Sequence, residues 1–180
     1  MSFVFDVSPF EPYTNDWRQE GRPWLAEQFC NVGQFLRGLR VRMRFGELTR
    51  APLHLIRLNI HGEIVKCDWL ARSPDPWDAG IAKNIRERHA SLRSLKDAID
   101  VRALLFETMP YVATADLRVY RTTVAFEREL IITGCVQRID HSARNIHSLA
   151  MRAKILGFRF QMEDNALIAM HVEDRNLIGD

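Results

Sequence analysis

The stretch that most constrains the fold is residues 129–172, where local signals agree on a strand, a helix and a closing hairpin. Residues 129–138 form a β-branched run of strand length with two alternating faces. A helix is expected to follow, with Ser142 offering a side-chain oxygen to its first amides and Gly157 ending it. Alternating apolar and polar residues come next, and Asp164-Asn165 suit a tight hairpin turn. The unit is therefore predicted to be β-α-β-β.

A hairpin and a long helix are expected earlier in the chain. Residues 53–60 and 63–70 flank His61-Gly62 at the separation of a two-residue turn, which the glycine makes cheap. Asp75 is expected to cap the following helix, and Pro110 is expected to end it. The buried stripe of this helix is predicted from apolar residues at helical spacing, namely Ile81, Ile85, Leu92, Leu95 and Ile99.

The order of these elements predicts an α+β fold. A strand over residues 117–124 pairs with residues 129–138, so the order ββα occurs twice and is followed by two more strands. We expect an antiparallel-rich sheet with two main helices packed on one face. The ferredoxin-like sandwich is the nearest architecture, since the order from residue 63 onward is β-α-β-β-α-β. The strand at residues 53–60 would occupy an edge that the last strand of that architecture normally takes, which leaves the strand order open.

The N-terminal part is expected to be accessory to one domain over residues 1–180. Residues 1–22 form an aromatic-rich arm, which is expected to pack on its own domain or to cross to a second copy as a dimer contact. Residues 23–37 carry an apolar stripe at helical spacing and predict an accessory helix. The sheet-and-helix body then covers residues 39–172, and a tail covers residues 173–180.

Composition argues against several classes of protein. The 25 basic and 23 acidic residues leave a net charge of +2, which gives no global attraction to nucleic acid or to a membrane. No run approaches the ~20 apolar residues of a membrane span. The three cysteines, Cys30, Cys67 and Cys135, are widely spaced among apolar neighbours, as is typical of buried thiols. We therefore expect a cytoplasmic location and no membrane partner.

Catalytic and cofactor motifs are missing from the sequence. The six histidines are scattered, without the spacing of metal ligands, and no glycine-rich phosphate loop or nucleophile elbow occurs. The aspartates and glutamates have simple solvent-facing or capping interpretations. We therefore expect no metal and no cofactor, and we favour a non-enzymatic protein.

One local concentration of charge lies where apolar residues alternate with Arg40, Arg42 and Arg44. The period of two predicts a half-buried strand with a cationic outer face. Guanidinium groups in a row can bind a small phosphate or carboxylate anion. The simpler interpretation is an edge strand guarded by charge against aggregation, or internal ion pairing. With a net charge of +2, sequence-specific binding of nucleic acid is not expected.

Two functional hypotheses follow. The first is a non-enzymatic module that acts through self-association, as a homodimer, or through another protein partner. The second is a protein that binds an anionic small molecule, or an enzyme, with a pocket between the sheet and the helices. Its polar groups would be His54, Arg57, Asp68 and Tyr120, which come from neighbouring predicted strands.

Overall fold

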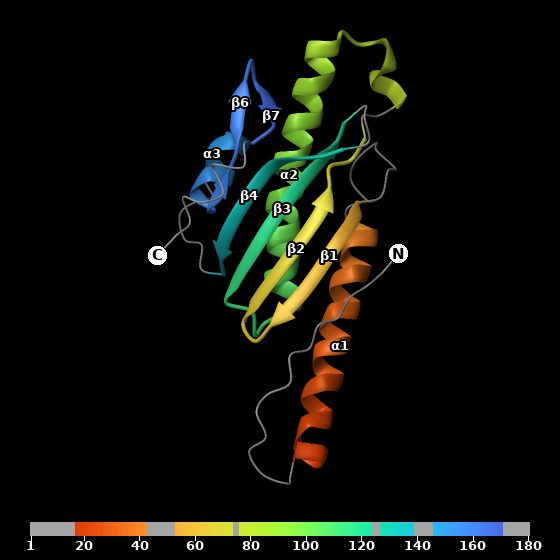
Figure 1. The fold of residues 1–180 in the computed structure, drawn as a ribbon, viewed down its shortest axis with the longest axis vertical. Helices are drawn as coiled ribbons and strands as arrows, with labels where there is room; N and C mark the ends of the chain where they lie inside the picture. The colour runs from red at the N-terminus through yellow and green to blue at the C-terminus, as the bar shows by residue number, and fades with distance from the viewer. Residues whose placement is uncertain (1–16, 43–52, 74–75, 124–126, 139–145, 171–180) are drawn as a thin grey trace.

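A computed structural model describes residues 17–42, 53–73, 76–123, 127–138 and 146–170 of the chain, and the structural statements below concern these ranges. Figure 1 shows one sheet backed by the long helix α2, with α1 beside it and a small C-terminal unit on the other side. The elements are α1 (Trp17–Arg42), β1 (His54–His61), β2 (Ile64–Leu70), η1 (Pro76–Gly80), α2 (Lys83–Thr108), β3 (Thr114–Thr122), β4 (Arg128–Gln137), α3 (Leu149–Ile155), β5 (Phe158–Arg159), β6 (Gln161–Glu163) and β7 (Ala166–Ile168).

The main sheet has five strands in the order β1-β2-β3-β4-β5, and β6 and β7 form a separate two-stranded sheet. The strands β2 and β3 run parallel because α2 carries the chain back between them, while the other neighbouring pairs are antiparallel. The predicted α+β class with an antiparallel-rich sheet is therefore confirmed. A ferredoxin-like order is not confirmed, because that arrangement places another strand between two strands joined by a helix, whereas β2 and β3 are direct neighbours.

The first hairpin forms as predicted, although its turn lies one residue later in the chain. Strand β1 ends at His61 and strand β2 begins at Ile64, so the turn is Gly62-Glu63. Gly62 has a φ angle of 57°, a left-handed conformation that glycine adopts without steric cost. A two-residue turn at His61-Gly62 predicts Leu58 opposite Val65, whereas the observed register pairs Leu58 with Cys67, two residues away. From Arg57 onward the predicted faces survive, because a shift by two residues keeps a side chain on its side of the sheet. Before it, a bulge between Leu55 and Arg57 places Leu55 opposite Trp69, on the core side.

The core lies between the sheet and α2. Alternate residues of β2 and β3 are fully buried on this side, namely Val65, Cys67, Trp69, Ala115, Leu117 and Val119. Helix α2 contributes Leu95, Ile99 and Leu105. The prediction for the N-terminal part of this helix is wrong: Ile85 and Leu92 are 44% and 37% exposed. The reason is geometric, since this part of α2 extends beyond the end of the sheet (Figure 1).

Helix α2 also begins later than predicted. Residues Pro76–Gly80 form a short 3-10 helix, and α2 starts only at Lys83, after Ala82 at the N-cap position. Asp75, which was expected to cap the helix, lies outside the described residues. The predicted end is confirmed, because α2 stops at Thr108, before Pro110.

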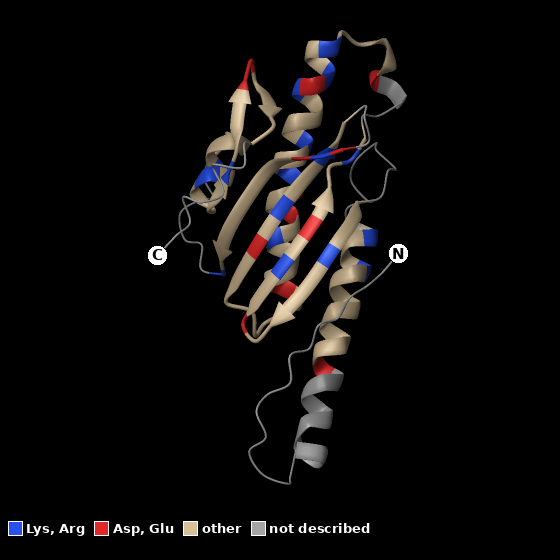
Figure 2. Cartoon of the chain, in the orientation of Figure 1, with Lys and Arg blue, Asp and Glu red and all other residues tan. Residues whose placement is uncertain are grey.

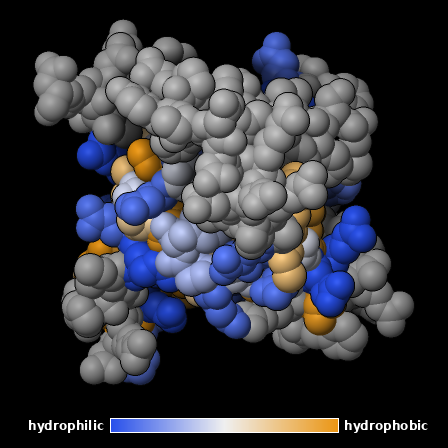
Figure 3. All heavy atoms as spheres, turned by 90° about the horizontal axis from the view of Figure 1, so that it is seen from below, coloured by the Kyte–Doolittle hydropathy of each residue, from blue (hydrophilic) through white to orange (hydrophobic). Residues whose placement is uncertain are grey.

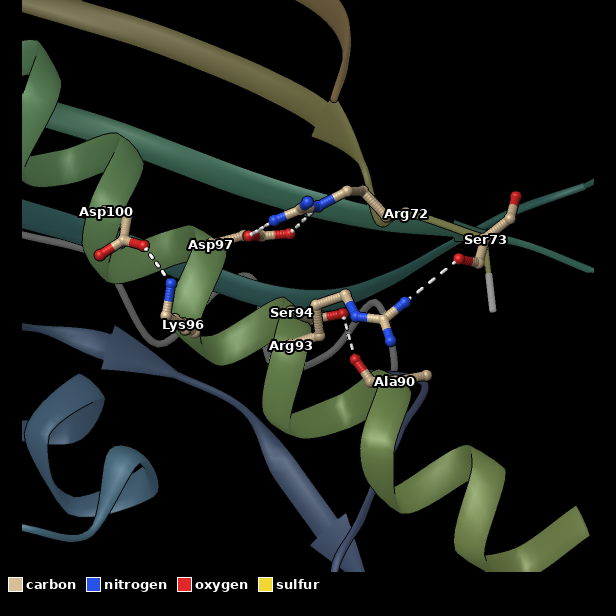
Figure 4. A network of polar contacts seen from close by, with 8 residues as sticks. All are labelled: Arg72, Ser73, Ala90, Arg93, Ser94, Lys96, Asp97 and Asp100. Atoms are coloured by element: carbon tan, nitrogen blue, oxygen red, sulfur yellow. Dashed lines mark hydrogen bonds and ion pairs between the residues drawn. The ribbon is translucent and has the colours of Figure 1, made fainter. Parts of the chain in front are cut away.

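A buried ion pair fastens α2 to the end of β2. The Arg72 guanidinium donates to both carboxylate oxygens of Asp97, one contact measuring 2.8 Å, and the two side chains are 1% and 2% exposed. Close by, Arg93 of α2 donates to the Ser73 carbonyl oxygen at 3.4 Å (Figure 4). The two hydrogen bonds between Arg72 and Asp97 fix the relative orientation of the two side chains as well as their distance. The segment after β2 is therefore held against the middle of α2.

The C-terminal end of α2 is held by Arg138, which follows β4. Its guanidinium donates to the carbonyl oxygens of Phe106, Met109 and Val112 at 2.5 to 2.9 Å. Helix C-termini leave their last carbonyls without partners inside the helix, and Arg138 supplies donors there, although the Met109 carbonyl also accepts from the Val112 amide. Arg138 thus joins the helix end to β4. Arg102 and Arg138 both lie 5.2 Å from the centre of the Phe106 ring, a cation–π distance.

Helix α1 corrects the prediction made for residues 39–45. A helix was expected over residues 23–37 with a strand after Gly38, but α1 continues to Arg42, so Arg40 and Arg42 lie on a helix. Leu39 is buried because it shares a helix face with Val32 and Phe35. Gly38 does not end the helix: a Cβ atom there would come within 2.6 Å of the Leu104 side chain, so the glycine allows α1 to approach α2 closely.

The C-terminal unit keeps the predicted order, with shorter elements. Ser148 caps α3 by accepting a hydrogen bond from the Met151 amide at 3.4 Å, whereas the cap predicted at Ser142 lies outside the described residues. The hairpin turn at Asp164-Asn165 is confirmed, with φ angles of 49° and 65°. Its strands are β6 and β7, and the Leu167 amide donates to Ser91 of α2 at 2.8 Å. This small sheet therefore packs on the helix.

We expect Asp97→Ala to lower the free energy of unfolding by about 3–5 kcal/mol, because it leaves the Arg72 charge buried without its carboxylate. Lys96→Ala is a matched control, since Lys96 pairs with Asp100 at the surface and should change stability by no more than about 0.5 kcal/mol. Urea unfolding followed by circular dichroism measures both. Equal effects of the two substitutions would contradict the role of the buried pair.

A pair of glycines tests the packing. In Gly134→Ala the new Cβ would lie 2.9 Å from the Gly157 carbonyl oxygen, so we expect a loss of about 1–3 kcal/mol. Gly33 of α1 has open space around its Cβ position, and Gly33→Ala should stabilise the chain by up to about 1 kcal/mol through helix propensity. The same urea titration decides, and a Gly134→Ala variant as stable as the natural chain would refute the close approach of β4 and β5.

Candidate functional site on the open face of the sheet

The two faces of the main sheet differ in cover. Helix α2 packs on the face that carries Cys67, Trp69 and Leu117. No described helix lies over the opposite face, which is turned toward the viewer in Figure 1. We call this the open face. Figure 2 shows that acidic and basic residues alternate across it on β1, β2 and β3.

The strand register arranges the open face in rows. One row runs Arg57, Asp68, Arg118 and Thr133 across β1 to β4, and we call it the Arg57 row. The next row runs Asn59, Lys66, Asp116 and Cys135, and we call it the Lys66 row. Successive rows are two residues apart, about 6.5 Å along the strand. Within each row a carboxylate lies beside at least one cation.

Asp68 is the most enclosed charged residue of this face. It forms an ion pair with Arg57 at 2.7 Å, and the two side chains are 8% and 43% exposed. Its Oδ1 atom is buried and has no hydrogen-bond partner among the described residues. Burial raises the pKa of the carboxyl above its usual value and outweighs the opposing attraction of Arg57 and Arg118. The ion pair with Arg57 thus holds one carboxylate oxygen of Asp68, while the other, Oδ1, has no hydrogen-bond donor in the described chain.

Arg118 and Asp116 form a second ion pair on β3. The guanidinium donates to the carboxylate at 3.1 Å, and both side chains are partly exposed. Burial alone would lower the pKa of Arg118, but Asp116, Tyr120 and Asp68 raise it above its usual value. Arg118 therefore keeps its charge and links the two rows.

Two further groups of the open face have no partner within the described part of the chain. Lys66 is exposed and forms no ion pair with the described part of the chain. The Asn59 Oδ1 atom is buried and has no hydrogen-bond partner there. The open face therefore presents an exposed cation, Lys66, and the described chain leaves two buried oxygens of this face, on Asn59 and Asp68, without a hydrogen-bond partner.

The structure brings the four pocket candidates onto one face. Arg57 and Asp68 are in contact, and His54 and Tyr120 are both in register with Leu70 in the adjoining row. These residues alternate with those that face α2, so they do not line a space between the sheet and that helix. The arginine candidates do not join them: Arg40 and Arg42 lie on α1, and Arg44 lies outside the described residues.

Sequence reasoning missed Asp116 and Arg118 as parts of this face. A signal for β3 was present, since Asp116, Arg118 and Tyr120 alternate with the buried Leu117 and Val119. It could not be joined to Asp68, because the parallel pairing of β2 with β3 spans the whole of α2.

Among the residues with described positions, no three or more His, Cys, Asp or Glu side chains are grouped so as to hold a metal ion. None of the described helices is long and apolar enough to cross a membrane. No protein-family model matches the chain, and no curated protein or solved structure matches it either.

The raised pKa of Asp68 predicts a pH dependence of stability. The folded chain binds the Asp68 proton more tightly than the unfolded chain, whose carboxyl has the ordinary value of 3.8. Its contribution to stability is therefore greatest below that pH and is lost as the pH rises through the folded-state pKa. Asp68→Asn no longer titrates, so its stability relative to the natural chain should increase between about pH 4 and about pH 7.

Urea unfolding at a series of pH values and low protein concentration measures this difference. Asp116→Asn removes a more exposed carboxylate from the neighbouring row and serves as the control. A relative stability of Asp68→Asn that falls with rising pH would show that ion pairing dominates over burial at this carboxyl.

Proposed function

We propose that the chain is a non-enzymatic binding module that acts by self-association through the open face of its sheet. The observation that carries the proposal is Asp68, whose carboxylate is 8% exposed while its Oδ1 atom has no partner in the described chain. A buried acceptor without a donor is costly, and a second surface that brings a donor removes that cost once the side chains covering the acceptor shift aside. A cytoplasmic location is part of the same proposal.

Within the described ranges, the exposed apolar residues form no competing surface of comparable definition. The large ones are distributed over four elements, namely Phe29 and Val41 on α1, Ile64 on β2, Ile85 and Leu92 on α2, and Met151 and Ile155 on α3. From the end at which α1 protrudes, the surface drawn in colour is mostly hydrophilic, with separate hydrophobic spots (Figure 3). A dimer surface of ordinary kind would show such residues gathered in one patch.

The free edge of β1 is also a poorer candidate than the open face. The register of β1 against β2 shifts between Leu55 and Arg57, which marks a bulge around Ile56. Bulges on edge strands disturb the ladder of backbone groups that a second strand would need. Association through the face avoids this obstacle, since it uses side chains.

A small anion is the second candidate ligand, because Arg57 and Arg118 both lie beside the same point of the sheet. That point is filled by Asp68, a carboxylate of the chain itself, which Arg57 contacts at 2.7 Å. An added anion would have to displace this carboxylate or be repelled by it. Self-association is therefore favoured over anion binding.

We expect the natural chain to form dimers that dissociate in the micromolar range. Four strands about 4.8 Å apart and about seven residues long give roughly 450 Å² of flat area per copy, below the standard size of about 800 Å². Sedimentation velocity from about 1 µM to about 500 µM would show the transition. A single species of one-chain mass at every concentration would overturn the proposal.

Two arginine substitutions, one on the open face and one on α2, test which side of the molecule forms the dimer contact. Cys135→Arg alters an exposed position of the open face, and we expect it to abolish dimer formation in the same concentration range. Ala103→Arg places the same side chain at an exposed position of α2 and should leave association unchanged. Dimers that survive Cys135→Arg but not Ala103→Arg would assign the contact to the helix side.

A further inference from the structure

We infer that the second copy packs on the open face with its strands antiparallel to those of the first, about a twofold axis that crosses the strands between the Arg57 row and the Lys66 row. The inference rests on the proposed self-association and adds its geometry. In a twofold interface the same patch is used on both copies, so the patch must be complementary to itself. The two rows meet this condition.

The proposed axis places the Arg57 row of one copy over the Lys66 row of the other. Asp68 then faces Lys66 of the second copy, and Arg118 faces Asp116 of the second copy. Each contact occurs twice, which gives four pairs of opposite charge. In this register no cation faces a cation, and no carboxylate faces a carboxylate.

This register also supplies the groups that the single chain lacks. The Lys66 ammonium of the second copy, which is exposed and unpaired in the described chain, faces Asp68, and a shift of the side chains that cover Asp68 Oδ1 lets this oxygen accept its hydrogen bond. Asn59, whose Oδ1 has no partner among the residues with described positions, faces Arg57 of the second copy. Packed sheets lie about 10 Å apart, a gap that a lysine or arginine side chain spans with ease.

The ends of β2 fit the same arrangement. Ile64 lies one row beyond the Lys66 row and is 48% exposed, a high value for a residue in a strand. Leu70 lies one row beyond the Arg57 row, at the other end of β2. The twofold axis brings these two side chains together across the interface, so that each copy covers an apolar residue of the other.

A twofold axis parallel to the strands, running between β2 and β3, is the competing arrangement. It would also oppose unlike charges, with Asp68 over Arg118 and Lys66 over Asp116. However, it leaves Asn59 facing Cys135 and Ile64 facing Thr114, so neither finds a suitable partner. The crossing axis accounts for more of the unpaired groups.

Complementary charge reversals test the register. Asp116→Arg would set two guanidinium groups against each other at the contact with Arg118 of the second copy, and Arg118→Asp would set two carboxylates against each other at the same contact. We expect each variant alone to dimerise at least about tenfold more weakly than the natural chain, because like charges oppose each other twice. An equimolar mixture of the two variants should recover the natural affinity. In the mixed dimer, both contacts between position 116 of one copy and position 118 of the other join an arginine to an aspartate.

The mixture separates contacts between copies from contacts within one chain. Each reversal also breaks the Arg118–Asp116 ion pair inside its own chain, and mixing cannot repair that loss. Arg88→Glu on the exposed face of α2 is the matched control and should leave the dimer unchanged. Circular dichroism checks that each variant is folded; Lys66→Asp mixed with Asp68→Lys offers the same test on β2 if either β3 variant unfolds.

The outcomes distinguish this inference from the proposed function. A natural chain that stays monomeric removes the proposed function itself. A natural dimer that the single reversals leave intact removes the register while self-association stands. Recovery on mixing Lys66→Asp with Asp116→Lys, without recovery for the 116 and 118 pair, would assign the parallel axis and overturn the crossing one.

Discussion

The buried ion pair between Arg72 and Asp97 is the interaction on which the arrangement of the rest depends. It joins the end of β2 to the middle of α2 in two-point geometry, with both side chains almost fully enclosed. Replacing such a pair by well-packed apolar residues need not cost stability, but removing one partner does. Its contribution is therefore to fix where α2 lies. With α2 held on one side of the strands, the other side keeps its polar side chains outward.

Arg138 adds a second attachment, at the C-terminal end of α2. It satisfies three carbonyl groups near the helix end, and its position just after β4 connects the helix to the central strands. The two arginines thus hold a helix of 26 residues at two widely separated points. Because α2 is anchored at its middle and at its C-terminal end, the pairing of β2 with β3 beneath it is well defined. That pairing in turn creates the rows of the open face.

The parts of the fold that depend on local signals were predictable from the sequence. The first hairpin, the end of α2 before Pro110 and the turn at Asp164-Asn165 follow from glycine, proline and asparagine chemistry at fixed positions. The errors arose where tertiary packing decided. Alternation after Gly38 predicted a strand, but burial of Leu39 against α2 extended the helix. The exposure of Ile85 follows from the length of the sheet, which periodicity does not encode.

The candidate site was predictable only in part, for the same reason. Arg57 and Asp68 lie on the two strands of a local hairpin, so their contact could be anticipated. Arg118 and Asp116 join them through the parallel pairing of β2 with β3, which no short-range pattern specifies. The strand predicted for Arg40, Arg42 and Arg44 gave the wrong surface, since a helix accounts for the first two of these residues. The unpaired oxygens of Asp68 and Asn59 emerge only once the side chains are placed.

The central claim is that a second copy covers the open face with its strands antiparallel. Isotope-filtered nuclear Overhauser spectroscopy on an equimolar mixture of ¹³C-labelled and unlabelled chain tests it most directly. The account predicts intermolecular signals between the methyl groups of Leu70 and those of Ile64, which lie at opposite ends of one strand and cannot meet within a chain. Intermolecular signals from Ile85 and Leu92 of α2, with none between Leu70 and Ile64, would contradict it.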